Sequence, residues 1–254
     1  MISRYDASLN GVSISSINPA IVVTDIQYAE AGRKHQTYSL ANMDGGQIYQ
    51  STKEKASVTI LFMIRAYDVA ERQRICRDIG RWAQMGGELK CNDREGQKLV
   101  CVCDAKPYIS SAMRWTDNLP VTFTAYEIPY WQEVSISSLS LSGANGSGTL
   151  FVPGDAPETL VETTITASAA LSSVSLTVNG KTMTLSELSI ASGESIVVSY
   201  DEHGILSIKT GTTSLLNKRT GADDLRAVCG EKNSVSFTAS ASCTVVFRAR
   251  GRWD

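Results

Sequence analysis

The sequence is poor in histidine, proline and tryptophan, and it has no long apolar run. Its 254 residues include two histidines, six prolines and four tryptophans. No apolar segment approaches the roughly 20 residues that cross a bilayer. The two histidines, His35 and His203, lie far in sequence from the six cysteines, and no C-x-x-C pair occurs, so the spacing does not indicate a zinc site. We expect the cysteines to be small buried residues that stay reduced.

Motifs that carry catalysis are also lacking. Neither a G-x-S-x-G nucleophile elbow nor a G-x-x-x-x-G-K-[ST] phosphate loop is present. His203 lies in the expected turn from Asp201 to Gly204, where turn chemistry explains it. His35 has no acid or nucleophile at short range, and the adjacent acids Asp223 and Asp224 are typical of solvated loops. We therefore expect no enzymatic activity and no cofactor or metal.

Charge of either sign is close to balanced. The net charge is −2, residues 1–133 hold 15 acids and 15 bases, and the rest of the chain holds 11 acids and 9 bases. Neither half has the basic excess that neutralises phosphates, so we expect no nucleic-acid partner. The opening residues "MISRYDASLNGVSISS" lack an apolar core segment. We therefore expect no signal peptide, synthesis in the cytoplasm and no insertion into a membrane.

Residues 1–134 are predicted to form a β-sandwich domain with one helix. The segment 57–67, "SVTILFMIRAY", alternates with the period of a strand, whereas residues 68–86 change to a helical period. Asp68 and Glu71 have the spacing of a capping box, and Gly86-Gly87 is typical of a helix end. The apolar face of this helix is predicted to contain Val69, Ile75, Ile79, Trp82 and Ala83.

The chain after residue 134 is predicted to form a linker followed by a second sandwich. Residues 135–157 contain "GANGSG", so we expect a flexible or turn-rich linker and an entry strand. Residues 158–254 have the short strands and turns of a jelly roll or a galectin-like β-sandwich. Asn179-Gly180 predicts a two-residue hairpin turn, and a second hairpin is expected around Asp201 to Gly204. Two final strands are expected in 233–253, with inward side chains at Val235, Phe237, Val245 and Phe247.

A carbohydrate-binding role of the second domain is an alternative function. Sugar sites stack saccharide rings on exposed aromatic side chains, and few aromatics remain after Ser135 once inward positions are removed. Tyr200 and Trp253 are the two candidate platforms for a sugar or a partner protein. Because two platforms are few, a structural or interaction domain is favoured.

The segment from Glu30 to Gln50 is the main candidate for a functional surface. It contains Arg33, Lys34, His35, Tyr38, Asp44 and Tyr49. A phosphate-binding loop would place its glycines directly before a helix, but Gly45-Gly46 is followed by the strand-like "QIYQSTKEKASVTI". Two interpretations remain: a hairpin arm that contacts another subunit, and a plain surface hairpin.

The order of these segments resembles the distal tail proteins of long-tailed, siphovirus-like bacteriophages. The resemblance rests on "IVVTDIQYAEAGRKHQTYSLANMDGGQIYQSTKEKASVTILFMI", the capped helix with a tryptophan, "GGELKCND" and "NLPVTFTAYEIPYW". The family's N-terminal sandwich has one helix, an extended hairpin and an aromatic-proline ending, which Tyr126, Pro129, Tyr130 and Trp131 match here. The second half is similar to the family's galectin-like domain through "GDAPETLVETTIT", "VNGKTMTL", "CGEKNSVSFTAS" and "RARGRW".

The resemblance implies an architectural role. Distal tail proteins form a hexameric ring at the end of the tail tube and join it to tail-fibre, baseplate, hub or receptor-binding proteins, without a cofactor. The implied location is the virion tail tip, and the implied partners are copies of the same chain and other tail proteins. The alternative is a carbohydrate-binding module on a structural stem that recognises host polysaccharide. A tail-associated hydrolase is disfavoured by the missing catalytic motifs.

Overall fold

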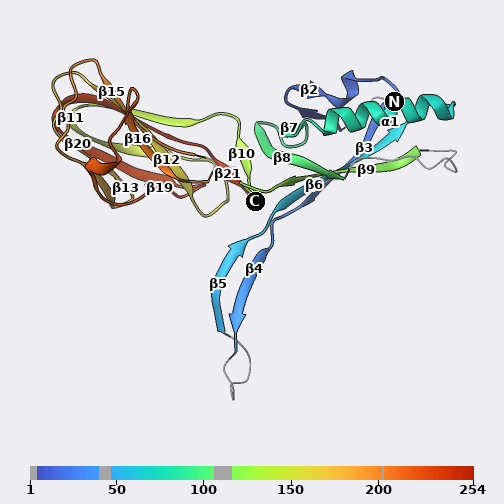
Figure 1. Cartoon of the computed structure of the whole chain (residues 1–254), viewed down its shortest axis with the longest axis horizontal. Coiled ribbons are helices and arrows are strands. Elements are labelled where there is room, and N and C mark those ends of the chain that lie inside the picture. Colours follow the sequence, from blue (N-terminus) through green and yellow to red (C-terminus); the bar gives the residue numbers. More distant parts are fainter. Residues whose placement is uncertain (1–4, 40–46, 106–115, 202) are drawn as a thin grey trace. The chain divides into compact units, whose positions relative to one another are not determined.

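The computed structural model describes residues 5–39, 47–105, 116–201 and 203–254 (Figure 1). Its described residues are mainly β-strands, with α1 (Val69–Ala83) as the one α-helix among them. The chain divides into an N-terminal unit, Met1–Trp131 with Asp254, and a C-terminal unit, Gln132–Trp253. β10 (Trp131–Glu133) lies at the division, and Asp44 lies outside the described residues. The predicted mainly-β fold with one helix is confirmed.

The N-terminal unit is a curled antiparallel sheet with α1 packed on its inner face. The strands follow the order β2-β1-β7-β8-β9-β6-β3. Alternate residues of β6 are buried, including Val58, Ile60 and Phe62, as the sequence predicted. Their bounds are β1 (Ala7–Leu9), β2 (Val12–Ser13), β3 (Ile21–Ala29), β6 (Ala56–Ile64), β7 (Gly87–Cys91), β8 (Gln97–Ala105) and β9 (Thr116–Ala125), with the 3₁₀ turn η1 (Ile14–Ser16) after β2.

Both ends of α1 follow the predicted signals. The Asp68 carboxylate accepts a hydrogen bond from the Glu71 backbone N–H at 3.2 Å, and Gly86 has the left-handed φ of 57°. The prediction that Val69 is on the buried face is wrong, because Val69 is 39% exposed. Arg72 is the buried side chain of the first turn, and its Nη1 donates to the carbonyl oxygens of Ala66 and Tyr67 at 2.9 and 3.1 Å.

The core of the N-terminal unit centres on Trp82. Its ring makes edge contacts with Phe62 of β6 and Phe123 of β9, at centroid distances of 6.5 and 5.7 Å. The indole Nε1 donates to the Val12 carbonyl oxygen at 2.9 Å, so the buried polar atom of this side chain is satisfied. Trp82 therefore joins the helix, the middle of the sheet and the β1–β2 hairpin.

The C-terminal unit is a β-sandwich, with ten of its strands in one hydrogen-bonded network. The order is β17-β16-β15-β12-β20-β13-β14-β18, with β11 also on β20 and β19 on β12. The bounds are β11 (Ser137–Phe151), β12 (Thr159–Ala167), β13 (Val174–Val178), β14 (Lys181–Leu185), β15 (Ser195–Tyr200), β16 (Leu206–Thr210), β17 (Thr213–Ser214), β18 (Arg219–Gly221), β19 (Arg226–Ala227), β20 (Lys232–Ala249) and β21 (Arg252–Trp253), with the 3₁₀ turn η2 (Leu216–Lys218).

A long ribbon of β11 and β20 contributes to both layers of the sandwich. The two strands pair from Ser137↔Ala249 to Phe151↔Lys232, with a register shift between Gly143 and Asn145. β20 pairs with β13 through Val235–Ala239 and with β12 through Cys243–Ala249. The two expected final strands are therefore one bent strand, although Val235, Phe237, Val245 and Phe247 are buried as predicted.

Most of residues 135–157, predicted as a linker and an entry strand, forms the strand β11. Glycine in this segment permits close packing rather than flexibility. A Cβ on Gly146 would lie 2.8 Å from Cε1 of Phe237, and a Cβ on Gly148 would lie 2.8 Å from Cδ2 of Leu139. Both distances are shorter than real contacts allow, so any larger residue would push the neighbouring side chain away.

The predicted hairpins of the C-terminal unit are confirmed. Asn179 and Gly180 join β13 to β14 with φ values of 48° and 82°, which is the type I′ geometry. In the second hairpin, the Asp201 carboxylate accepts from the backbone N–H groups of His203 and Ile205 at 3.0 and 2.8 Å. This turn gives His203 a structural setting.

Candidate functional site

The most prominent surface feature of the N-terminal unit is a separate hairpin of β4 (Arg33–Tyr38) and β5 (Gln47–Lys53). Figure 1 shows these strands as a two-stranded ribbon apart from the curled sheet. Every residue of the two strands is exposed except Lys53, which is half-buried. We call β4 and β5 the arm. Because its side chains are outside the core, the arm is not needed to complete the sandwich.

One side of the arm combines tyrosines with amides. Directly paired residues of an antiparallel ladder point to the same side. A bulge at Tyr49 shifts the register between Gln36 and Thr37. The Tyr38 and Tyr49 rings lie 6.0 Å apart, and their hydroxyls donate to Oε1 of Gln47 and Gln36 at 2.5 and 2.6 Å. This amide–aromatic face consists of Lys34, Gln36, Tyr38, Gln47, Tyr49, Gln50 and Thr52.

The opposite side of the arm is basic. It consists of Arg33, His35, Thr37, Ile48, Ser51 and Lys53. The structure thus brings Tyr38 and Tyr49 together and places Lys34 on the side opposite Arg33 and His35. The sequence analysis had assigned all five to one functional surface. Sequence reasoning missed the glutamines and Ile48, which is 59% exposed. Alternation within "QIYQSTK" was the available signal, but the bulge interrupts it.

The base of the arm is held by a charged and aromatic cluster. Lys53 forms an ion pair with Asp254, and its Nζ lies 3.9 Å from the centre of the Tyr130 ring. The Arg94 guanidinium stacks on Trp131 at 5.0 Å and also donates to the Asp254 carbonyl oxygen at 3.5 Å. Cation–π contacts of this kind stabilise by about 0.5–1 kcal/mol each at exposed sites. Tyr130 and Trp131, which belong to the aromatic-proline segment that resembles the distal tail family, therefore help to fix the arm where it leaves the sheet.

The two candidate sugar platforms are engaged within the C-terminal unit. The Tyr200 hydroxyl accepts a hydrogen bond from the Leu225 backbone N–H at 3.0 Å, and burial raises the pKa of this phenol. Trp253 is half-buried and its Nε1 donates to Oε2 of Glu133 at 3.2 Å. The polar atom of each ring is therefore used within the unit, and both residues are half-buried.

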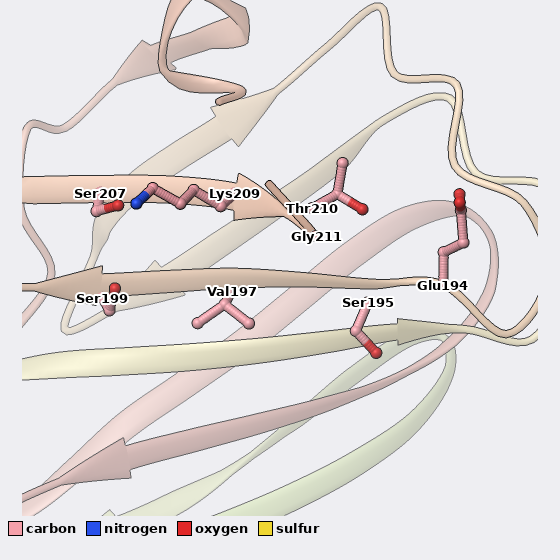
Figure 2. Close-up of a pocket in the computed structure, with 8 residues that line it drawn as sticks. All are labelled: Glu194, Ser195, Val197, Ser199, Ser207, Lys209, Thr210 and Gly211. Atoms are coloured by element: carbon pink, nitrogen blue, oxygen red, sulfur yellow. The ribbon is translucent and has the colours of Figure 1, made fainter. Parts of the chain in front are cut away.

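A shallow hollow of about 540 Å³ lies on the outward face of β15 and β16 (Figure 2). It is lined by Glu194, Ser195, Val197, Ser199, Ser207, Lys209, Thr210 and Gly211. The Glu194 carboxylate accepts from the Ala191 backbone N–H at 2.8 Å and so belongs to the adjoining turn. Four of these eight residues carry a hydroxyl and none is aromatic, so the hollow offers a saccharide hydrogen-bonding groups but no stacking platform.

The cysteines form no reactive centre in the described chain. All six are described, none forms a disulfide, and five are buried, as expected. No group of three or more His, Cys, Asp or Glu side chains suited to a metal occurs among the described residues. Likewise, no helix in the described ranges is long and apolar enough to cross a membrane.

We predict that the free energy of unfolding declines at alkaline pH because of two buried thiols. Burial raises the pKa of both the Cys91 and the Cys101 thiols from 9.0 to about 12. Because the folded chain holds these protons more tightly, their stabilising contribution is complete below pH 9 and is lost as the pH rises toward 12. Urea unfolding midpoints should therefore fall as the pH rises from about 9 to about 11. Replacing both thiols by alanine should flatten this slope, and an unchanged slope would contradict the assignment.

Comparisons with known proteins find the fold of this chain among solved structures. No family model matches the chain, and no curated protein matches it. Among solved structures, the chain is similar to the SPP1 Dit (gp 19.1) protein, described as a paradigm of the hub adsorption apparatus in phages that infect Gram-positive bacteria. The TM-score is 0.72 at 10% identity, over 97% of this chain and 98% of that chain.

Two weaker similarities are to chains of the phage P2 baseplate in its activated conformation. The TM-score is 0.45 in both, with 8% and 7% identity, covering 99% and 97% of this chain and 98% and 97% of those chains. The likeness to SPP1 Dit shows the fold. The fold expected from the resemblance to distal tail proteins is therefore confirmed over nearly the whole chain.

Proposed function

We propose that this chain is a structural subunit of a phage tail tip, a hub protein that joins the tail tube to fibre, baseplate or receptor-binding proteins. The observation that carries the proposal is the match of both units together to the SPP1 Dit fold, over 97% of the chain. In this role six copies form a ring, and the subunit acts by binding other chains rather than by catalysis. It belongs to the virion tail.

The exposed arm is consistent with a ring in which the arm of each subunit contacts the next subunit. An isolated two-stranded hairpin is marginally stable in water. The arm exposes Tyr49 and Ile48 at 62% and 59%, which is a large apolar area for a surface hairpin. A contact between the arm of one copy and the body of the next is heterologous, and closed repetition of such a contact produces a ring.

The carbohydrate-binding alternative has less support. Its two aromatic platforms, Tyr200 and Trp253, are hydrogen-bonded within the C-terminal unit. The hollow on β15 and β16 has hydroxyls but no ring. We therefore propose docking of another tail protein, rather than of a sugar, as the role of the C-terminal unit.

Shortening the arm should abolish ring formation without unfolding the protein. The Glu54 backbone N–H donates to the Gly32 carbonyl oxygen at 2.8 Å at the base of the arm. If only two residues joined Gly32 to Glu54, this same bond would close a two-residue turn. Replacing residues 33–53 with Asn-Gly should therefore give a tight hairpin. We expect nearly native circular dichroism and melting, because the strands of the arm are outside the core. Native mass spectrometry should show six-chain particles only for the full-length arm.

The control for this deletion is Lys53→Met, which removes the ion pair at the arm base while keeping the arm. It should retain most of the assembly. Six-chain particles formed by the shortened protein would refute the role of the arm. A full-length protein that gives only dimers or tetramers, even with tail-tube protein added, would refute the hub.

A further inference from the structure

We infer that the free edge of β11 binds an extended segment of another protein as an additional strand. This inference rests on the proposed function, in which the C-terminal unit docks another tail protein, and it names the element that docks and the kind of chain that it takes. In the described chain, β11 pairs with β20 alone, so one side of it has no neighbouring strand. We call residues 137–143 of β11 the open edge.

Three serines of the open edge point their backbone N–H and C=O groups away from the sheet. The Ser168 N–H donates to the Ser242 carbonyl oxygen at 3.0 Å, so Ser242 and every second residue after it in β20 point their backbone groups toward β12. The residues of β11 opposite these positions exchange no hydrogen bonds with them and point the other way. They are Ser138, Ser140 and Ser142, opposite Arg248, Val246 and Thr244. All three serines are exposed, and no other segment of the described chain bonds to their backbone groups.

The open edge lacks the features that normally protect an exposed strand edge. Soluble proteins keep edge strands short, or place charges, prolines or bulges on them. Edge strands elsewhere in the chain follow this rule, because β2, β17 and β18 have two or three residues and β3 carries Asp25 beside a bulge. β11 is 15 residues long and has neither a charge nor a proline, and its bulge lies at the end of the open edge. Such an edge is suited to accept a strand.

The side chains of the open edge define the chemistry of the partner. Leu139 and Leu141 lie opposite the buried Phe247 and Val245, yet both leucines are half-buried. An added strand would place its own inward side chains beside these leucines and complete their burial. The outward side chains are serine hydroxyls, so the edge offers no charge to a partner. The partner is therefore an uncharged extended segment in which apolar residues alternate with small polar ones.

A second copy of this chain is the competing occupant. It would offer its own open edge, and a pair of that kind occupies both edges and leaves neither for docking. The proposed function therefore favours a different protein, and a dimer through β11 is a separate outcome of the test.

A proline at the open edge tests the inference. Ser140→Pro removes one outward N–H and leaves the hydrogen bonds to β20 in place, which is the setting in which an edge strand tolerates proline. Ser140→Ala is the matched control, because it removes the hydroxyl and keeps the N–H. The probe is a fluorescent peptide of alternating valine and threonine, as long as the open edge, with a lysine pair at each end. It is titrated against the full chain by fluorescence anisotropy.

Two methylated forms of the probe make the test independent of the folding of the proline variant. In an antiparallel pair the threonines of the probe lie opposite the serines and direct their N–H groups at β11, while the valines lie beside the leucines. Methylation of the threonine nitrogens should abolish binding to the wild-type chain, whereas methylation of the valine nitrogens should retain it. Amide exchange measured by NMR should slow at Ser138, Ser140 and Ser142 when the unmethylated probe is bound.

We expect saturable binding to the wild-type chain, weakened about tenfold or more by Ser140→Pro and less than about threefold by Ser140→Ala. Equal binding to the wild-type chain and to a Ser140→Pro variant with an unchanged unfolding midpoint would overturn the inference. Equal binding of the two methylated probes, or no saturable binding of the unmethylated one, would also overturn it.

Native mass spectrometry separates this inference from the hub. Ser140→Pro should still form six-chain particles, because the open edge is not a ring contact. Absence of six-chain particles from the wild-type chain, even with tail-tube protein added, would refute the hub and leave the peptide titration to decide the open edge. A wild-type dimer that Ser140→Pro abolishes would show that a second copy occupies the edge, and it would overturn the choice of partner.

Discussion

Truncation of Trp82 to alanine is expected to lower the free energy of unfolding of the N-terminal unit by about 3–5 kcal/mol. The indole is 3% exposed and contacts Phe62 and Phe123 at the centre of the core. Its loss leaves a cavity that the sheet and helix cannot both close. It also leaves the Val12 carbonyl oxygen without its indole partner. Thermal or urea unfolding followed by circular dichroism would measure the change.

Two further variants separate the causes. Trp82→Phe keeps most of the ring contacts and removes the hydrogen bond, so we expect about 1–3 kcal/mol of destabilisation. Met85→Ala removes a side chain that is 62% exposed just beyond the end of this helix, and it should change stability by less than about 0.5 kcal/mol. An unchanged unfolding midpoint for Trp82→Ala would show that α1 does not pack on the sheet as described.

Replacement of Asn233 by alanine is expected to destabilise the C-terminal unit by about 3 kcal/mol. Asn233 is 1% exposed, and its amide joins three segments of the sandwich. Oδ1 accepts from the Val228 backbone N–H and from Nδ2 of Asn179 at 2.7 and 2.8 Å. Nδ2 donates to the carbonyl oxygens of Val228, Glu231 and Leu150. Alanine at this position would leave the buried backbone groups and the Asn179 amide without a hydrogen-bond partner.

Asn145→Ala is the matched control, because Asn145 lies exposed on β11. It should change the unfolding free energy by less than about 0.5 kcal/mol. Asn233→Asp keeps both acceptor bonds but loses the donors, so it should also destabilise strongly at neutral pH. Equal midpoints for Asn233→Ala and Asn145→Ala would show that the buried network contributes little.

Local features of this fold were predictable from the sequence. The Asp68 cap, Gly86 and the Asn179-Gly180 turn each depend on a few neighbouring residues. Alternation in β6 placed Val58, Ile60, Phe62 and Ile64 correctly, because the period of a strand is local as well. The signals that decide caps, turns and faces are therefore present in short windows.

Features that depend on distant contacts were not predictable. "GANGSG" has the composition of a linker, yet Gly146 and Gly148 are small because Phe237 and Leu139 approach them. Nothing within the segment reveals that β20 pairs with it. The arm shows the same limit, because the bulge at Tyr49 decides which side chains share a face. The bonds of Tyr200 and Trp253 to Leu225 and Glu133 likewise join residues that are distant in sequence.

The ribbon of β11 and β20 has a consequence for how the chain folds during synthesis. β11 is the first long strand of the C-terminal unit and β20 is almost the last, with Ser137 paired to Ala249. Both layers use this ribbon, so the β13 side needs residues up to Ala239, and the β12 side needs residues up to Ala249, before it can be completed. Pairings of such long sequence separation fold slowly. The paired residues of the arm are close in sequence, from Tyr38↔Gln47 to Arg33↔Lys53, so its strands are synthesised long before the sandwich can be completed, whereas its ion pair with Asp254 must wait for the last residue.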